Sequence, residues 1–222
     1  MINSEEMIQY LRALIPESQG ILKELEEEAE RDKVPIIQPE VAQLLETLIM
    51  THQSKKVLEI GTAIGYSTIR FAGAVAPFDG QVVTIELQDR MRQRALKNIS
   101  RAGYDQFVTS FLGDAREVIP LELAHLKANF DFIFIDAAKG QYVEFFKLCL
   151  PLLAPGGLLV ADNVLYKGWV VPDAIFPRRQ KTLITRLRTL LRELFNREDF
   201  KSTLLPMGDG VLVSYYKEVK SK

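Results

Sequence analysis

From Lys56 onward, short runs of β-branched and aromatic residues alternate with longer amphipathic segments rich in Ala, Leu, Arg and Glu. The short runs are "KVLEI", "QVVTIEL", "FVTSFL", "FDFIFID" and "GLLVADNV". Such nearly continuous apolar strands are typical of a parallel sheet that helices cover on both faces. The last stretch, "STLLPMGDGVLVSYYK", predicts two further strands that return on each other through "GDG". The pattern therefore predicts a mostly parallel, seven-stranded α/β sheet with an antiparallel C-terminal hairpin.

The first 52 residues have a different, helical periodicity in three pieces. Breaks fall at "IPES" and "VPIIQP", because proline lacks an N–H donor and restricts the residue before it. Nine acids and four bases within the first 35 residues suggest a solvated helix face. We therefore predict one domain over residues 1–222, with an N-terminal helical cap at 1–53 and a sheet core at 54–222.

Composition excludes several classes of protein. The net charge of the 222 residues is -1, so overall charge draws the chain neither to nucleic acid nor to membranes. The single cysteine, Cys149, rules out a disulfide framework. No basic leader and no long apolar stretch are present. We expect a cytoplasmic protein without a membrane span.

The stretch "VLEIGTAIGYSTI" places Gly61 and Gly65 directly after the first predicted strand. In open α/β sheets a ligand binds beyond the carboxyl ends of the strands, where glycines let the backbone approach it. The dinucleotide pattern G-x-G-x-x-G is absent, which weakens a nicotinamide interpretation. Glu59, just before the turn, would repel a pyrophosphate but suits a ligand that carries an ammonium or a sulfonium.

Two more acids follow at strand ends. Glu86 ends "QVVTIEL", where such folds place an acid that binds a ribose diol. In "FLGDA", Asp114 and Ala115 could contact an adenine edge, although Asp114 is also a common type of helix cap. In this order, the residues indicate a nucleoside-containing ligand.

A second polar group follows the fourth and fifth predicted strands. Asp136 ends "FIFID", and Asp162 and Asn163 end "GLLVADN". Neighbouring parallel strands lie about 4.8 Å apart, so these side chains can converge at one edge. Their all-oxygen set suits Mg²⁺, Mn²⁺ or Ca²⁺. The alternative is that Asp136 caps a helix and the other two residues form a turn.

Between Val34 and Tyr216 the chain resembles the class I S-adenosylmethionine-dependent methyltransferases, and within them the cation-dependent O-methyltransferases that act on catechol and caffeoyl-CoA. The stretches that carry the resemblance are "VPIIQPEVAQLLETL", "VLEIGTAIGYSTI", "IELQ", "GDA", "FDFIFIDAAKGQYVEFF", "LLAPGGLLVADNVL" and "LPMGDGVLVSYYK". The resemblance implies a Rossmann-like fold and a homodimer.

The same resemblance implies roles for individual residues. The cofactor site would be lined by Glu59, Gly61, Thr62, Gly65, Ser67, Glu86, Asp114, Ala115 and Asp136. The metal would be bound by Asp136, Asp162 and Asn163. Lys139, in "DAAK", matches the lysine next to the acceptor hydroxyl, and with Asp136 it forms the predicted catalytic pair.

The region after the fifth strand bears on the acceptor. Six bases and no acid lie between Arg178 and Arg192. One interpretation is the polar face of an amphipathic helix that buries Leu183, Ile184, Leu187, Leu190 and Leu191. The other is a phosphate footprint, in which Arg178, Arg179 and Lys181 contact RNA. Tyr166 and Trp169 could stack on a base, or simply pack within a loop.

This region resembles the bacterial branch of the family that methylates 5-hydroxyuridine at the wobble position of tRNA. The 5-hydroxyl and 4-carbonyl of that base are vicinal oxygens, as in a catechol, and an anticodon loop presents the base unstacked. The expected function is therefore Mg²⁺-dependent methylation of tRNA 5-hydroxyuridine to 5-methoxyuridine, with the tRNA anticodon loop as partner. Two alternatives remain: O-methylation of a small catechol-like or caffeoyl compound, and a non-catalytic nucleic-acid-binding module.

Overall fold

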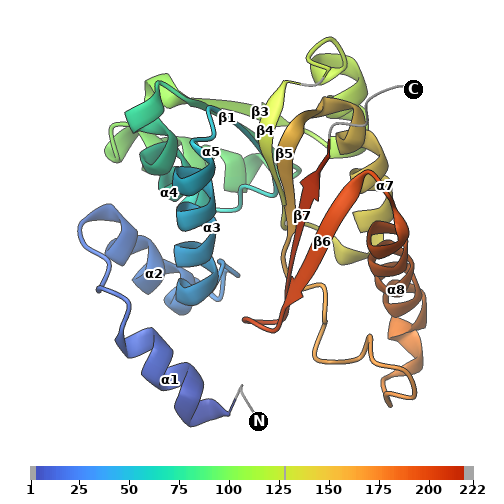
Figure 1. The fold of residues 1–222 in the computed structure, drawn as a ribbon. Coiled ribbons are helices and arrows are strands. Elements are labelled where there is room, and N and C mark those ends of the chain that lie inside the picture. Colours follow the sequence, from blue (N-terminus) through green and yellow to red (C-terminus); the bar gives the residue numbers. More distant parts are fainter. Residues whose placement is uncertain (1–3, 128, 218–222) are drawn as a thin grey trace. The chain divides into compact units, whose positions relative to one another are not determined.

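The computed structural model describes residues 4–127 and 129–217. The chain divides into two compact units, Met1–Asp114 and Ala115–Lys222. Both have strands between helices (Figure 1).

The first unit begins with the predicted cap of three helices: α1 (Glu5–Ala13), α2 (Ile21–Asp32) and α3 (Pro39–His52). Ser4 caps α1, because its side chain accepts the N–H of Met7 at 3.3 Å. The ring of Pro39 suits the first turn of α3, where no N–H partner is needed. Arg12 joins α1 to α3 through two hydrogen bonds to the Glu40 carboxylate, of 2.8 and 2.9 Å.

The strands of this unit are β1 (Lys56–Ile60), β2 (Gln81–Glu86) and β3 (Val108–Leu112), in the order β3-β2-β1. Both pairs are parallel. The helices α4 (Tyr66–Val75) and α5 (Asp89–Arg101) connect them, with short 3₁₀ turns at Ala76–Phe78 and Asp105–Phe107. This is the predicted β-α-β alternation.

The acids of α2 do not form the purely solvated face that the sequence suggested. Arg94 of α5 forms ion pairs with Glu28 and Asp32, and Arg101 pairs with Glu24. The local charge count could not reveal this, because the partners lie more than 60 positions along the chain. The acidic helix is therefore held against α5 by arginines.

The second unit contains β4 (Phe130–Ile135), β5 (Leu153–Ala161), β6 (Phe200–Leu205) and β7 (Val211–Tyr216), in the order β4-β5-β7-β6. β4 and β5 are parallel, whereas β7 is antiparallel to both β5 and β6. The α-helices of this unit are α6 (Ala115–Val118), α7 (Tyr142–Cys149) and α8 (Lys181–Asn196). A short π-helix covers Ile119–Leu123. Three 3₁₀ turns lie at Lys139–Gln141, Leu150–Leu152 and Arg178–Gln180.

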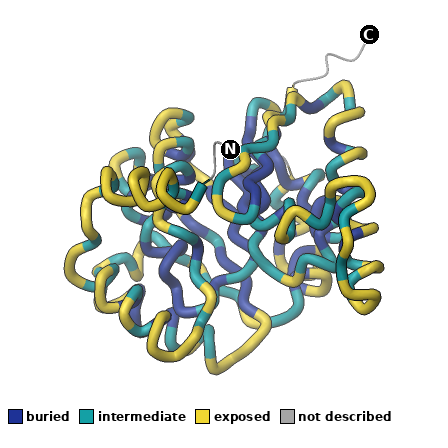
Figure 2. The backbone as a smooth tube through the Cα atoms, turned by 90° about the horizontal axis from the view of Figure 1, so that it is seen from below, coloured by how far each residue is buried: buried dark blue, intermediate teal, exposed yellow. Residues whose placement is uncertain are grey.

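The described residues contain seven strands, and the predicted mostly parallel Rossmann-like arrangement with an antiparallel C-terminal hairpin is confirmed. Figure 2 colours the chain by burial, and the buried residues include most of β1, β4 and β5. In β4, residues 132–135 are all buried, which explains why this strand reads as one apolar run rather than as an alternating pattern. No helix of the described residues is long and apolar enough to span a membrane.

Candidate functional site

The glycine loop between β1 and α4 has a backbone that few residues other than glycine adopt. Gly61 and Gly65 have φ of 104° and 88°, in the left-handed region. A Cβ added at Gly65 would also lie 3.2 Å from Ala95 of α5. The turn therefore depends on Gly65 for its conformation and for the close approach of α5.

Glu59, at the end of β1, is fully buried and organises this loop. Its carboxylate accepts hydrogen bonds from the hydroxyls of Ser67 and Thr68 at 2.5 Å each and of Thr84 at 2.7 Å. Thr62 in the loop shares a 2.6 Å hydrogen bond with Thr84. A buried carboxylate needs such donors, so Glu59 joins β1, β2, the loop and the start of α4.

Glu86, at the end of β2, is 7% exposed and holds the other side of the loop. Its carboxylate accepts the backbone N–H groups of Ala63 and Gln88, both at 2.9 Å. Ala63 is itself left-handed, with φ of 48°. Each carboxylate oxygen has more than one acceptor site, so Glu86 can still accept a hydroxyl, as the sequence predicts.

The remaining predicted cofactor residues follow β3. The N–H of Gly113 donates to the carbonyl of Glu86 at 2.9 Å, which places Asp114 after the strand that neighbours β2. Asp114 is half-buried. Ala115 begins α6 in the second unit and is 5% exposed. The contact of these two residues with an adenine stays a prediction.

In the second unit, Asp136 follows β4, and Asp162 and Asn163 follow the neighbouring strand β5. Lys139 donates from Nζ to Oδ1 of Asp136 at 2.9 Å, and each of these two side chains is 24% exposed. Asp162 is 2% exposed. Its Oδ1 accepts the backbone N–H of Asn163 at 2.6 Å. The predicted catalytic pair is thus in direct contact, next to a nearly inaccessible carboxylate.

Within this group, the negative charge of Asp162 is poorly compensated. Burial, and then the negative charge of Asp136, raise the pKa of Asp162 from its usual 3.8 to about 7. Burial and the charges of Asp136 and Asp162 also raise the pKa of Tyr142 well above 10. The Tyr142 hydroxyl donates to the carbonyl of Asp162 at 3.0 Å. An additional positive charge would relieve this repulsion.

The residues present fit a divalent cation. Asp136, Asp162 and Asn163 offer carboxylate and amide oxygens, which are the ligands that hard cations prefer. Among the described residues, no three His, Cys, Asp or Glu side chains gather closely enough to bind a metal without help. A cation would therefore depend on the amide of Asn163 and on oxygens from water or substrate, which leaves coordination positions open.

Of the six bases between Arg178 and Arg192, two have contacts within the second unit. Arg186 bonds to the carbonyl of Gly140, and Arg188 bonds to three carbonyls of the preceding loop. Among the described residues, the side chains of Arg178, Arg179, Lys181 and Arg192 have no hydrogen bond or ion pair, and all four are exposed.

The apolar stripe of α8 differs slightly from the prediction. Ile184, Leu187, Leu190 and Leu194 are buried, whereas Leu183 and Leu191 are only half-buried. The buried residues follow a narrower helical stripe than the one expected, and Leu194 extends it by one turn.

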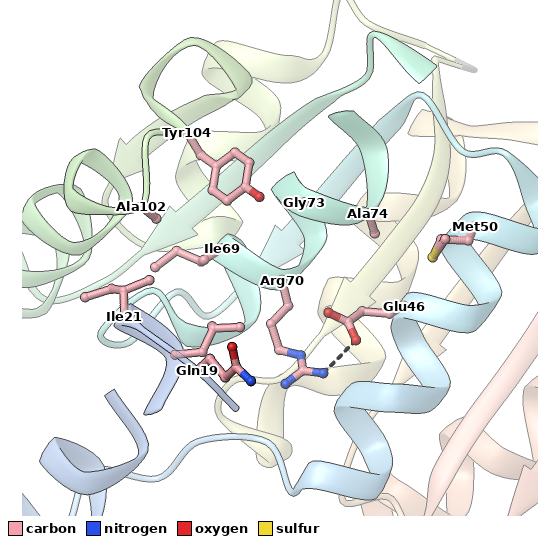
Figure 3. A pocket seen from close by; sticks show the side chains of 11 residues that line it. Gln19, Ile21, Glu46, Met50, Ile69, Arg70, Gly73, Ala74, Ala102 and Tyr104 are labelled. Atoms are coloured by element: carbon pink, nitrogen blue, oxygen red, sulfur yellow. Dashed lines mark hydrogen bonds and ion pairs between the residues drawn. The ribbon is translucent and has the colours of Figure 1, made fainter. Parts of the chain in front are cut away.

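A separate cavity of about 400 Å³ lies in the first unit, on the face of α4 shown in Figure 3. Arg70 lines it and donates to Glu46 at 2.6 Å and to the Tyr66 hydroxyl at 3.0 Å. Its Nε is the one buried side-chain nitrogen or oxygen of the described residues without a hydrogen-bond partner. None of the predicted site residues lines this cavity.

Sequence reasoning missed several residues that shape these groups. Thr68 and Thr84 bind Glu59, and their hydroxyls on buried faces of α4 and β2 were a usable signal. The sequence places Asp209 only in a turn, yet its Oδ1 accepts the N–H of Lys167 at 2.5 Å. In the sequence, Arg188 is one of six bases, and nothing there marks it as a donor to backbone carbonyls.

A glycine loop flanked by buried acids and a separate oxygen-ligand set on an α/β framework are features of a Rossmann-like enzyme that binds a nucleoside cofactor. The comparison with known families gives the particular class: the chain belongs to the O-methyltransferase family, whose model matches residues 14–217.

Among curated proteins, the chain is 39% identical to a catechol O-methyltransferase of Niastella koreensis, over 62% of each chain. That match spans less than two thirds of the relative. The chain is also 29% identical to a caffeoyl-CoA O-methyltransferase of Stellaria longipes, over 95% of this chain and 90% of the relative.

Solved structures agree with the fold. An O-methyltransferase from Bacillus cereus in complex with SAH has a TM-score of 0.84 at 26% identity, over 96% of this chain and 97% of that one. TomG from Streptomyces achromogenes, in complex with SAM, has a TM-score of 0.83 at 28% identity, over 96% of each chain.

Proposed function

We propose that this protein transfers the methyl group of S-adenosylmethionine to one of two vicinal oxygens of an acceptor held at a divalent cation. Support for the cofactor comes from the Glu59 and Glu86 groups around the glycine loop and from the SAM and SAH complexes of similar structures. The observation that carries the cation is the buried, poorly compensated Asp162 carboxylate beside Asp136.

In this proposal Asp136, Asp162 and Asn163 bind the cation. When bound, Mg²⁺, Mn²⁺ or Ca²⁺ would lower the pKa of an acceptor hydroxyl and orient it. Lys139 provides the proton-transfer or electrostatic function, and Asp136 fixes its ammonium at 2.9 Å. The N–H of Asn163 donates to the Asp162 carboxylate at 2.6 Å and so fixes its orientation. Methyl transfer would then depend chiefly on the positioning of donor and acceptor.

For the acceptor, we propose tRNA 5-hydroxyuridine, with Arg178, Arg179 and Lys181 on the phosphate backbone. The support is that these three exposed cations have no hydrogen bond or ion pair with another described residue, so they are available for phosphates. They lie in the 3₁₀ turn before α8 and at the first residue of α8. In the sequence they follow the predicted metal ligands.

A second candidate acceptor is a small catechol-like or caffeoyl compound. The names of the relatives favour it, because they act on catechol and caffeoyl-CoA. The same oxygens of the protein would serve either acceptor, since both present two neighbouring oxygens.

The deciding experiment is methyl transfer from labelled S-adenosylmethionine with Mg²⁺. The acceptors are tRNA that carries 5-hydroxyuridine, tRNA that lacks it, and catechol with caffeoyl-CoA. Label on the hydroxylated tRNA alone, lost with EDTA, would support both the acceptor and the cation. Label on the small phenols alone would refute the tRNA acceptor. No transfer to any acceptor, with no binding of S-adenosylmethionine, would favour a non-catalytic nucleic-acid-binding module.

A further inference from the structure

The chain between Val164 and Gln180, here called the 164–180 loop, starts one residue after Asn163 and is drawn in orange in Figure 1. The β6–β7 turn holds its first residues. The N–H groups of Val164 and Leu165 donate to the carbonyls of Gly210 and Asp209 at 3.0 and 2.9 Å, and the Asp209 carboxylate accepts the N–H of Lys167.

Arg188 of α8 holds the middle of the loop. Its Nε donates to the carbonyl of Val170 at 3.0 Å, and its Nη2 donates to those of Trp169 and Val171 at 3.2 and 2.6 Å. The guanidinium also lies 5.9 Å from the ring centroid of Phe176. One planar cation thus satisfies three consecutive carbonyls, which a lysine ammonium cannot do with the same geometry.

The loop does not hold this conformation by itself. Tyr166, Lys167 and Asp173 have φ of 44°, 60° and 64°, a region that costs energy for residues other than glycine. Between its fixed points, Trp169 packs edge-on against Tyr166 at 5.6 Å and tilted against Phe176 at 6.2 Å. Without Arg188, the carbonyls of Trp169 and Val170 lose its donors, the carbonyl of Val171 keeps only the N–H of Ala174 at 3.3 Å, and the aromatic group loses its support.

We propose that Arg188 is a positioning residue that fixes the aromatic wall of the acceptor site. The inference rests on the proposed function in one respect: it takes the loop that follows Asn163 to line the site where the acceptor binds. The Nε and Nη2 donors of Arg188 are occupied by backbone carbonyls of the second unit.

The test compares Arg188→Lys with Arg197→Lys in the full chain. Arg197 is a matched control in the same unit, because it also has a two-pronged contact, with Asp199 at 2.9 and 2.6 Å, and also packs on aromatic rings. Both variants keep the positive charge and lose the planar guanidinium with its several N–H donors. Of the two arginines, Arg188 is the one that contacts the 164–180 loop.

We expect Arg188→Lys to raise the KM for the acceptor at least tenfold, with the affinity for S-adenosylmethionine within twofold of wild type. Hydrogen exchange at the amides of Lys167, Trp169 and Val171 should become at least tenfold faster. Arg197→Lys should leave both readouts within twofold. The acceptors used are catechol and tRNA that carries 5-hydroxyuridine.

Unchanged exchange in Arg188→Lys would overturn the proposal that Arg188 holds the loop. Faster exchange with an unchanged KM for an acceptor that the wild type methylates would overturn its role in the acceptor site. A wild type that methylates neither acceptor would refute the proposed function and with it the acceptor role, while the exchange data would still decide whether Arg188 fixes the loop.

Discussion

Replacing Asp162 by asparagine should stabilise the metal-free protein at neutral pH although it removes a predicted metal ligand. The pKa of Asp162 is raised from its usual 3.8 to about 7 by burial and by Asp136. The folded protein therefore binds more protons than the unfolded chain between these two pH values, and its stability falls as the pH rises through that window. Asparagine keeps an oxygen for the N–H of Asn163 and removes the charge.

The magnitude follows from the shift. About three pKa units, at about 1.4 kcal/mol each, give a loss of up to about 4 kcal/mol by pH 8. The side chain is 2% exposed, so solvent screens this cost little. For a chain of this length, about 4 kcal/mol corresponds to a rise in Tm of about 10 °C.

The assay is thermal unfolding of the EDTA-treated proteins at pH 5 and pH 8. The stability difference between wild type and Asp162→Asn should increase by roughly 2 to 3 kcal/mol from pH 5 to pH 8, because about two thirds of the window between the two pKa values lies above pH 5. Added Mg²⁺ should stabilise wild type only. Asp199→Asn is a control that should lower the stability rather than raise it, because the hydrogen bond from Arg197 lowers the pKa of Asp199 and stabilises its charged form. An equal difference between wild type and Asp162→Asn at both pH values would refute the electrostatic reasoning.

Three further predictions concern the other groups. Glu59→Ala should destabilise the protein by about 2 to 5 kcal/mol in urea unfolding, because three hydroxyls lose their acceptor. It should also abolish the binding of S-adenosylmethionine measured by calorimetry. An unchanged free energy of unfolding would contradict this. Gly65→Ala should lower the free energy of unfolding more than Gly103→Ala does. Both glycines have positive φ, but of the two only Gly65 has neighbours near an added Cβ. Equal losses would refute the steric contribution of those neighbours. Replacing Arg178 and Arg179 by alanine should lower the slope of log affinity for tRNA against log salt by up to about 1.5. An unchanged slope would exclude this pair as phosphate contacts.

The sequence predicted the parts of the fold that depend on local pattern. The strand ending at Glu86 and the hairpin through "GDG" were correct because apolar runs and turn residues lie close together in the chain. The order of acids at strand ends followed from the parallel topology, which places Asp136 and Asp162 after neighbouring strands.

Contacts between distant segments were beyond the sequence. Arg94 and Glu28 are 66 positions apart, and no local charge pattern pairs them. The same holds for Lys167 and Asp209, which are 42 positions apart. An isolated arginine such as Arg188 looks identical whether its donors face phosphates or carbonyls, since only the folded backbone brings the carbonyls into reach.

The Glu59 carboxylate also determines what could be transplanted from this protein. The stretch from Glu59 to Thr68 looks like a self-contained cofactor motif, but one of the three hydroxyls on Glu59 comes from Thr84 on β2. A loop grafted alone onto another scaffold would carry a buried carboxylate with an incomplete set of donors. The smallest portable module is therefore β1 with the loop, the first turn of α4, and β2 with its threonine, and a designer who borrows the motif must take both strands.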